Sequence, residues 1–216
     1  MLQAVPIAAS TFALRTPRLQ LRAFGAGDAD DVIALHSGRR LREHLLDDMP
    51  LDRPAAAALF LDRIQRIYRE HPGLGIWHAS VPQSGSACFA GWFSLMPLAG
   101  YPGEIELGSR LLASHWGQGV SMDGGEALLA HAFARLGRQR VWAACHPANR
   151  GARLCLRALG FTAGTPGIYA GQPAVLHSLG LASWRAQAGL PRRERLRAAS
   201  KALRDETEAP PLPALA

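Results

Sequence analysis

Four glycines surround the expected start of one helix, in the stretch SHWGQGVSMDGGEALLAHAF at residues 114–133. Gly117 and Gly119 precede the helix, and Gly124 and Gly125 fall within its first turns. A glycine-rich turn between a strand and a helix exposes backbone N–H groups at the positive end of the helix dipole, where an anion such as a diphosphate binds. A plain connecting loop is the alternative, because this signal is weak when taken alone.

The second glycine pair lies inside the helix, where each glycine costs roughly 0.5–1 kcal/mol relative to alanine. We therefore assign Gly124 and Gly125 to close packing against a strand or the ligand, and not to the anion site. The turn does not match G-x-G-x-x-G, because Met122 occupies the third glycine position, and G-x-x-x-x-G-K-[ST] is absent. Both a dinucleotide-binding fold and a P-loop lose support.

Glu106 is the candidate proton acceptor that we prefer, and it shares one face of an expected strand at 104–112 with Glu104. Three cysteines, Cys88, Cys145 and Cys155, form no C-x-x-C pair. We interpret them as reduced thiols of a cytoplasmic protein, and with no zinc-ligand pattern we expect no metal.

The chain of 216 residues is 48% hydrophobic and 19% charged, as expected of one soluble globular domain with a sizeable core. It contains no apolar run of the roughly 20 residues that a membrane span needs. Residues 1–18 have no basic stretch before their apolar part, so we expect no secretory signal.

A net charge of +7 favours anionic ligands, and the excess is concentrated at 135–157 and 191–197. A solvated arginine-rich surface is the simpler interpretation of the second cluster. Binding of nucleic acid or the ribosome is the alternative, but no aromatic residues interleave with these arginines.

Hydrophobic periodicity predicts the elements that position these residues. Strands are expected at 17–24, 75–80, 87–96, 104–112, 140–145, 160–164 and 174–181, and helices after residue 25, at 50–71, from the glycine turn to about 136, and at 150–160. This order indicates one α/β domain with a mixed, largely antiparallel sheet. We expect an N-terminal arm at 1–16, the domain at 17–184, and a basic C-terminal extension at 185–216 that is partly helical and then disordered.

The stretch ELGSRLLASHWGQGVS, with EALLAHAFARLGRQRVWAACHPANRGARLCLRALGF after it, resembles the core of the GNAT superfamily of acetyl-CoA-dependent N-acetyltransferases. It is most similar to the branch of ribosomal-protein N-terminal acetyltransferases typified by RimJ and RimL. The resemblance covers about 17–184 and is tightest over 106–161. It implies a GNAT-type fold with six to seven strands and about four helices.

The resemblance also implies a site for acetyl-CoA. The family pattern Q/R-x-x-G-x-G/A, whose backbone amides hold the coenzyme pyrophosphate, falls on Trp116, Gly117, Gln118, Gly119, Val120 and Ser121. Trp116 and Ser121 depart from it mildly. The strand residues that pair with the pantetheine arm correspond to Arg110, Leu111 and Leu112. Asn149 matches an asparagine that contacts the coenzyme, and a helix N-cap is its alternative role. Ser109, where an aromatic is common, puts the shape of the acceptor pocket in doubt.

Acetyl transfer from a thioester to an amine needs a base, a donor to the oxyanion and an acid for the thiolate. By resemblance, the backbone N–H of about Leu112 is the oxyanion donor, Glu106 the base and Tyr169 the acid. Pairing of Glu106 with an arginine, and a loop tyrosine without a catalytic role, are the alternatives. His78 and His146 are further base candidates. No cysteine nucleophile is required.

We therefore expect an acetyltransferase for a primary amine: a protein N-terminus, an antibiotic amino sugar, a polyamine or another metabolite. A catalytically silent acyl-CoA-binding regulatory module is the alternative from another class. The acceptor, the acyl chain length and a possible homodimer are left open.

Overall fold

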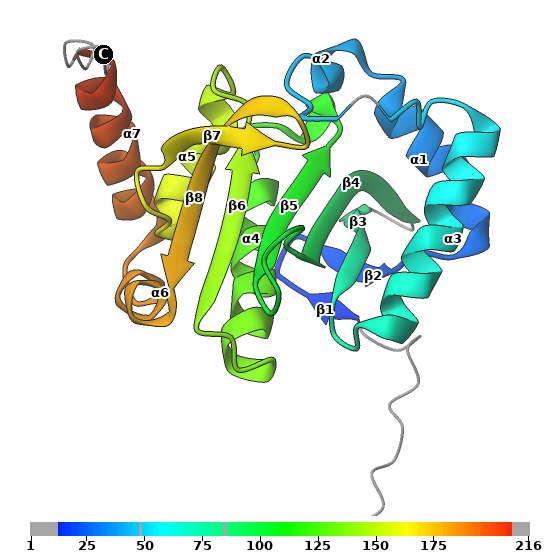
Figure 1. Ribbon diagram of the computed structural model, residues 1–216, viewed down its shortest axis with the longest axis horizontal. Helices are drawn as coiled ribbons and strands as arrows, with labels where there is room; N and C mark the ends of the chain where they lie inside the picture. Colours follow the sequence, from blue (N-terminus) through cyan, green and yellow to red (C-terminus); the bar gives the residue numbers. More distant parts are fainter. Residues whose placement is uncertain (1–12, 48, 84–85, 209–216) are drawn as a thin grey trace, which may run out of the picture.

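The computed structural model describes residues 13–47, 49–83 and 86–208, which contain one eight-stranded sheet (Figure 1). The strands lie in the order β1-β2-β3-β4-β5-β6-β8-β7. All neighbours are antiparallel except β5 and β6, which are parallel. The strands are β1 (Leu14–Arg15), β2 (Gln20–Ala23), β3 (Gly75–Gln83), β4 (Ser86–Pro97), β5 (Ile105–Leu111), β6 (Arg140–Cys145), β7 (Thr165–Tyr169) and β8 (Gln172–Gly180).

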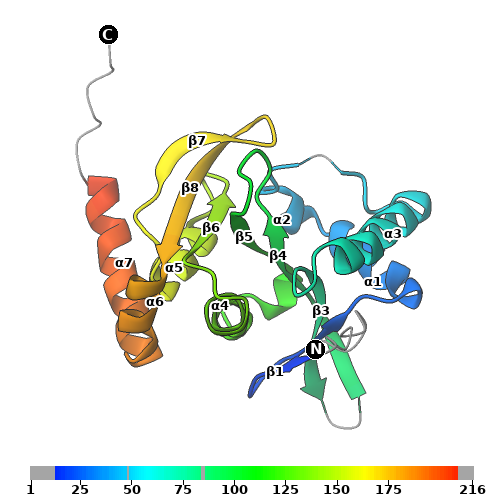
Figure 2. The same cartoon turned by 60° about the horizontal axis from the view of Figure 1, so that its bottom comes forward.

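Helices cover both faces of this sheet, as Figures 1 and 2 show from two directions. They are α1 (Ala29–His36), α2 (Arg39–Arg42), α3 (Pro54–Glu70), α4 (Val120–Ala130), α5 (Arg150–Leu159), α6 (Leu181–Ala188) and α7 (Arg192–Glu208). A π-helical turn, His131–Arg135, continues α4. Within the described residues, no helix combines the length and apolar character that crossing a bilayer requires.

Strand alternation separates two apolar cores on opposite faces of the sheet. Trp77 of β3 packs in a core with α4 and α5, whereas its neighbour Ile76 packs in a core with α1 and α3. Tyr68 of α3 joins the second core to the strands, because its hydroxyl accepts the Phe24 N–H at 3.0 Å and donates to the carbonyl of Ile76.

The glycine pair inside α4 allows close packing, as we expected from the sequence. A Cβ atom on Gly124 would lie 2.2–2.4 Å from ring atoms of Phe93 in β4. A Cβ atom on Gly125 would lie 2.7 Å from Leu159 of α5. Any side chain at these positions would push α4 away from the sheet or from α5.

The predicted fold class is confirmed, with more elements than expected. Leu14–Arg15, within the expected arm, pairs with β2, and α2 and α6 were not anticipated. The strand predicted at 160–164 is wrong: β7 begins at Thr165, because Gly160 ends α5 in the left-handed conformation (φ 98°) and Gly164 is also left-handed (φ 89°).

The expected C-terminal extension contains a well-formed helix, α7, and its proposed boundary at 184 falls inside α6. Most of the expected N-terminal arm and the expected disordered Pro/Ala end lie outside the described residues.

Gly124→Ala should lower the free energy of unfolding by about 1–2 kcal/mol, because an overpacking penalty of about 1–3 kcal/mol exceeds the gain of roughly 1 kcal/mol in helix propensity. Gly151→Ala in α5 is the matched control, since its Cβ would meet only Asn149 Oδ1 at 3.7 Å. Denaturant unfolding should show that variant to be unchanged or stabilised. Equal effects of the two substitutions would contradict the packing argument.

Candidate functional site

The strands β5 and β6 pair at a single register position, Glu106 with Trp142, and separate beyond it (Figure 1). The edge of β5 from Leu107 to Leu111 therefore has no strand partner on the β6 side. Its other edge pairs with β4 along its whole length. We call this interruption of strand pairing in the middle of the sheet the opening. The backbone groups along it can hydrogen-bond an extended ligand.

The direction of the backbone N–H groups along β5 corrects the expectation that the Leu112 N–H is the oxyanion donor. The Leu112 N–H donates to the Ala90 carbonyl at 2.9 Å, so it is engaged with β4 and does not serve an oxyanion. Because successive N–H groups in an antiparallel ladder point to opposite edges, those of Leu111 and Ser109 face the opening. The register of β5 against β4 decides that the N–H of Leu111, and not that of Leu112, faces the opening. The sequence does not display this register.

Glu106 and Tyr169 meet at the closed end of the opening. The Tyr169 hydroxyl donates a hydrogen bond of 2.6 Å to Glu106 Oε1, across the 63 residues that separate them in the chain. Burial raises the pKa of Glu106, and the hydrogen bond from Tyr169 partly opposes that rise. Burial and the neighbouring carboxylate also raise the pKa of Tyr169, so its hydroxyl keeps its proton at neutral pH. A carboxylate with a raised pKa beside a protonated phenol is suited to proton transfer.

The glycine turn begins where the opening ends. Gly117 and Gly119 have φ values of 74° and 80°, and Gly119 is the N-cap of α4. The first bond of the helix ladder runs from the Asp123 N–H to the Gly119 carbonyl at 3.1 Å. The N–H groups of Val120, Ser121 and Met122 precede that ladder and are available to an anion.

Two side chains fix the conformation of this turn, one by a bond to the end of β5 and one by a bond within the connection. The Trp116 indole N–H donates to the Leu111 carbonyl at 2.9 Å, and Gln118 Nε2 donates to the Ser114 carbonyl at 2.6 Å. Trp116 therefore has a local structural role, although its ring remains 42% exposed beside the turn.

Arg110 lies on the same face of β5 as Glu106, two positions of that face further along. Its guanidinium lies 5.1 Å from the Trp92 ring centroid, donates to His36 Nε2 at 2.8 Å and pairs with Asp47. The side chain thereby ties α1 and the α2–α3 connection to β5. Only the backbone of Arg110 was predicted to be functional, and nothing in the sequence marked His36 or Asp47 as its partners.

Asn149 caps α5, because its Oδ1 accepts the Ala152 N–H at 3.0 Å. The N-cap interpretation is confirmed, and the coenzyme contact stays a prediction. Burial raises the pKa of Cys145 to about 11 and that of Cys155 to about 12, so both thiols are protonated at neutral pH. Neither is therefore suited to act as a nucleophile.

Neither candidate histidine has a described contact with Glu106. His146 stacks on His44 with ring centroids 5.6 Å apart. His78 lies on β3, where its Nε2 is 2.8 Å from Asp31 Oδ2.

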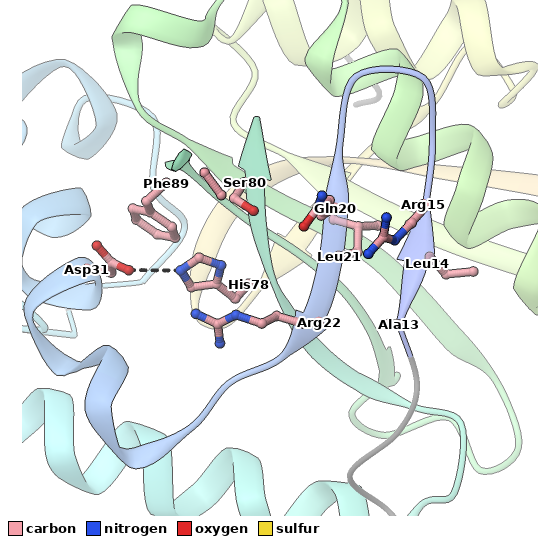
Figure 3. Close-up of a pocket in the computed structure, with 11 residues that line it drawn as sticks. Ala13, Leu14, Arg15, Gln20, Leu21, Arg22, Asp31, His78, Ser80 and Phe89 are labelled. Atoms are coloured by element: carbon pink, nitrogen blue, oxygen red, sulfur yellow. Dashed lines mark hydrogen bonds and ion pairs between the residues drawn. The ribbon is translucent and has the colours of Figure 1, made fainter. Parts of the chain in front are cut away.

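His78 instead lines a separate cavity of about 420 Å³ with Arg15, Arg22 and Phe89 (Figure 3). Asp28, Asp31 and His78 lie close enough to share a metal ion. Arg22 already holds both oxygens of Asp28, at 2.7 and 2.8 Å, and its positive charge opposes a cation there.

Comparisons with known proteins agree with this geometry. A model of the acetyltransferase (GNAT) domain matches residues 18–162, about two thirds of the chain. The ribosomal-protein-S5-alanine acetyltransferase from Vibrio fischeri is 17% identical over 80% of this chain and 98% of its own, with a TM-score of 0.65. The RimL ribosomal L7/L12 alpha-N-protein acetyltransferase is 16% identical over 82% and 99%, with a TM-score of 0.65. A GNAT-family acetyltransferase from Bacillus anthracis is 14% identical over 78% and 98%, also with a TM-score of 0.65.

Glu106→Gln should stabilise the protein more at high pH than at low pH. Because the folded-state pKa of Glu106 lies above its ordinary value of 4.5, the stability it contributes is complete below that pH and is lost as the pH rises through the raised pKa. A glutamine side chain does not ionise, so the variant does not lose this stability as the pH rises. Thermal unfolding at about pH 4 and about pH 8 measures the effect. A gain in melting temperature that is the same at both pH values would contradict burial of a titrating carboxyl.

Proposed function

The chain belongs to the GNAT acetyltransferase family, and from this premise we propose that it transfers an acetyl group from acetyl-CoA to a primary amine by direct attack in a ternary complex. The observation that carries the proposal is the continuity of the site. An unpaired strand edge leads from the Glu106–Tyr169 pair to a glycine turn at a helix N-terminus.

Acetyl-CoA matches this path in charge and in hydrogen-bonding groups. Its diphosphate would lie against the backbone amides of the turn, where Gly117 has no Cβ and where a built Cβ would meet no other atom within 4 Å. Its pantetheine arm carries amides that match the N–H and C=O groups on the edge of β5 that has no strand partner within the described residues, except the Leu111 carbonyl, which accepts the Trp116 indole N–H. The residues that we propose to hold the coenzyme are Leu111, Trp116, Gly117, Gln118, Gly119, Val120, Ser121 and Asn149. The backbone N–H of Arg110, like that of Leu112, points toward β4, so Arg110 is no longer among them. Leu111 replaces Leu112 as the proposed backbone donor to the oxyanion.

The pair at the closed end supports roles for both members. The carboxylate of Glu106 would take the proton that the attacking amine loses as its nitrogen bonds to the thioester carbonyl carbon. Tyr169 donates to that carboxylate until Glu106 becomes protonated, and its hydroxyl could then turn to the departing thiolate. The thioester C–S bond breaks as the thiolate leaves, and the Tyr169 hydroxyl would give the thiolate its proton. Protonated Glu106 would then return a proton to the Tyr169 oxygen, so the products are the N-acetylated amine and the free thiol of coenzyme A.

The acceptor is proposed only as a class. Two structural neighbours are acetyltransferases of ribosomal proteins, which supports a protein N-terminus as the acceptor. A small-molecule amine is the alternative acceptor. The buried Glu106–Tyr169 pair favours catalysis over a silent acyl-CoA-binding module, because a binding module needs no titratable pair at the end of its ligand path.

Calorimetry should detect binding of coenzyme A to the wild-type protein and at least roughly tenfold weaker binding to Gly119→Val, because a side chain at the N-cap keeps an anion from the amides. Gly100→Val is the matched control, since Gly100 has φ 79° and lies in the β4–β5 connection. It bears the same backbone strain away from the turn. Equal binding by all three proteins would remove the turn from the coenzyme site.

Glu106→Gln should lower kcat about 10²–10⁴-fold, the usual contribution of a general base, and leave coenzyme A binding unchanged.

Tyr169→Phe removes the hydrogen bond that lowers the pKa of Glu106. The acidic limb of the pH–rate profile should therefore move to higher pH in that variant. Thiol release from acetyl-CoA with a panel of amines measures both effects. Full activity of Glu106→Gln, or an unmoved acidic limb, would refute the assignment of the base.

A further inference from the structure

The C-terminal helix α7 lies outside the matched domain and is joined to it by charged contacts at both ends. Near its C-terminal end, Arg153 of α5 donates to Glu206 at 2.7 Å. Near its N-terminal end, Arg192 and Arg195 each donate to Glu126 of α4 at 2.5 Å. Burial would raise the pKa of Glu126, but hydrogen bonds from the two arginines hold it below its ordinary value. The start of α7 is thus bound to the helix that carries the glycine turn.

The same arginine cluster reaches a buried carboxylate in the first turn of α4. The side chain of Asp123 is only 3% exposed. Its Oδ1 lies 2.5 Å from Arg192 Nη1 and 3.5 Å from Arg18 Nη1. Its Oδ2 is buried and has no hydrogen-bond partner in the described part of the chain. An unneutralised negative charge here would repel a diphosphate at the N-terminus of the helix.

Both arginines also lie at the glycine turn itself. A Cβ built on Gly119 would be 2.7 Å from Arg18 Nη1 and 3.9 Å from Arg192 Nη1. Arg18 precedes β2 and Arg192 begins α7, so two segments from opposite ends of the chain meet at one helix N-cap (Figure 2 shows the start of α7 on the α4 side).

The charge balance of this cluster depends on α7. Three arginines, Arg18, Arg192 and Arg195, face the carboxylates of Asp123 and Glu126, so the cluster is net positive by one charge. Without the two arginines of α7 it would be net negative by one. The change would fall within the first two turns of α4, where the field of the helix N-terminus acts on an anion.

We propose that Arg192 is a positioning residue for the coenzyme: together with Arg18 it neutralises Asp123, so that the glycine turn accepts the coenzyme diphosphate. The C-terminal helix α7 then contributes to coenzyme binding and is not a solvated tail. This inference rests on the proposed function, because it assigns a helper to the same coenzyme site.

Calorimetry with coenzyme A on the full chain tests the proposal. Arg192→Gln should raise the Kd about tenfold or more, because it exposes the diphosphate to the Asp123 charge. Asp123→Asn should bind at least as tightly as wild type. The double variant Arg192→Gln/Asp123→Asn should return to within about threefold of the wild-type Kd, since no charge then needs neutralising. In steady-state assays Arg192→Gln should raise KM for acetyl-CoA and leave kcat nearly unchanged.

Arg204→Gln is the matched control, because Arg204 lies on the same helix and, among the residues that the structure describes, donates only to Ser200 Oγ, at 2.8 Å. It should bind coenzyme A as wild type does. Thermal unfolding separates loss of fold from loss of binding, and Asp123→Asn keeps the test open if Arg192→Gln is unstable. Unchanged binding by a folded Arg192→Gln, weaker binding by Asp123→Asn, or a double variant as weak as Arg192→Gln overturns this proposal alone. A wild-type protein that does not bind coenzyme A overturns the proposed function as well.

Discussion

The site depends on one constraint, the single register pair that joins β5 to β6. A sheet that continued to pair would satisfy every backbone group and leave no place for a ligand. Beyond Glu106 the N–H and C=O groups on one edge of β5 lack a strand partner, and such groups need a partner from water or a ligand. In the proposed function, the opening therefore sets both the path of the coenzyme and the place of proton transfer.

The packing of α4 places the glycine turn at the end of the opening that lies away from Glu106. Gly124 lets the helix approach Phe93, and Gly125 lets it approach Leu159. These two glycines lower the helix propensity of α4, and close packing of the helix on the sheet and on α5 offsets that loss. Gly119, in the left-handed conformation, then turns the chain from the end of β5 into the first turn of the helix. One helix thus has two glycine pairs with different roles: Gly124 and Gly125 allow packing, and we propose that Gly117 and Gly119 allow access of the ligand.

Electrostatics divide the site into two regions. At the turn, arginines from both ends of the chain surround Asp123. At the closed end, burial and a hydrogen bond from Tyr169 act in opposite directions on the pKa of Glu106. On the same face of β5, Arg110 is already paired with Asp47 and stacked near Trp92, so its charge is committed to holding the α2–α3 connection. A positive region for an anion and a region for proton transfer therefore lie at opposite ends of one strand.

The sequence alone determined the local features: the strand and helix periods, the capping of α5 by Asn149, the packing role of Gly124 and Gly125, and Glu106 and Tyr169 as separate candidates. The periods and the cap follow from forces within a few residues of the chain, which a linear pattern records, whereas the roles of Glu106 and Tyr169 came from the resemblance to a family. Only the tertiary structure decided that Tyr169 donates to Glu106, that the Leu112 N–H is engaged with Ala90, and that Arg192 reaches Asp123. The physical reason is that strand register and helix docking arise from packing between distant segments, which local periodicity does not encode.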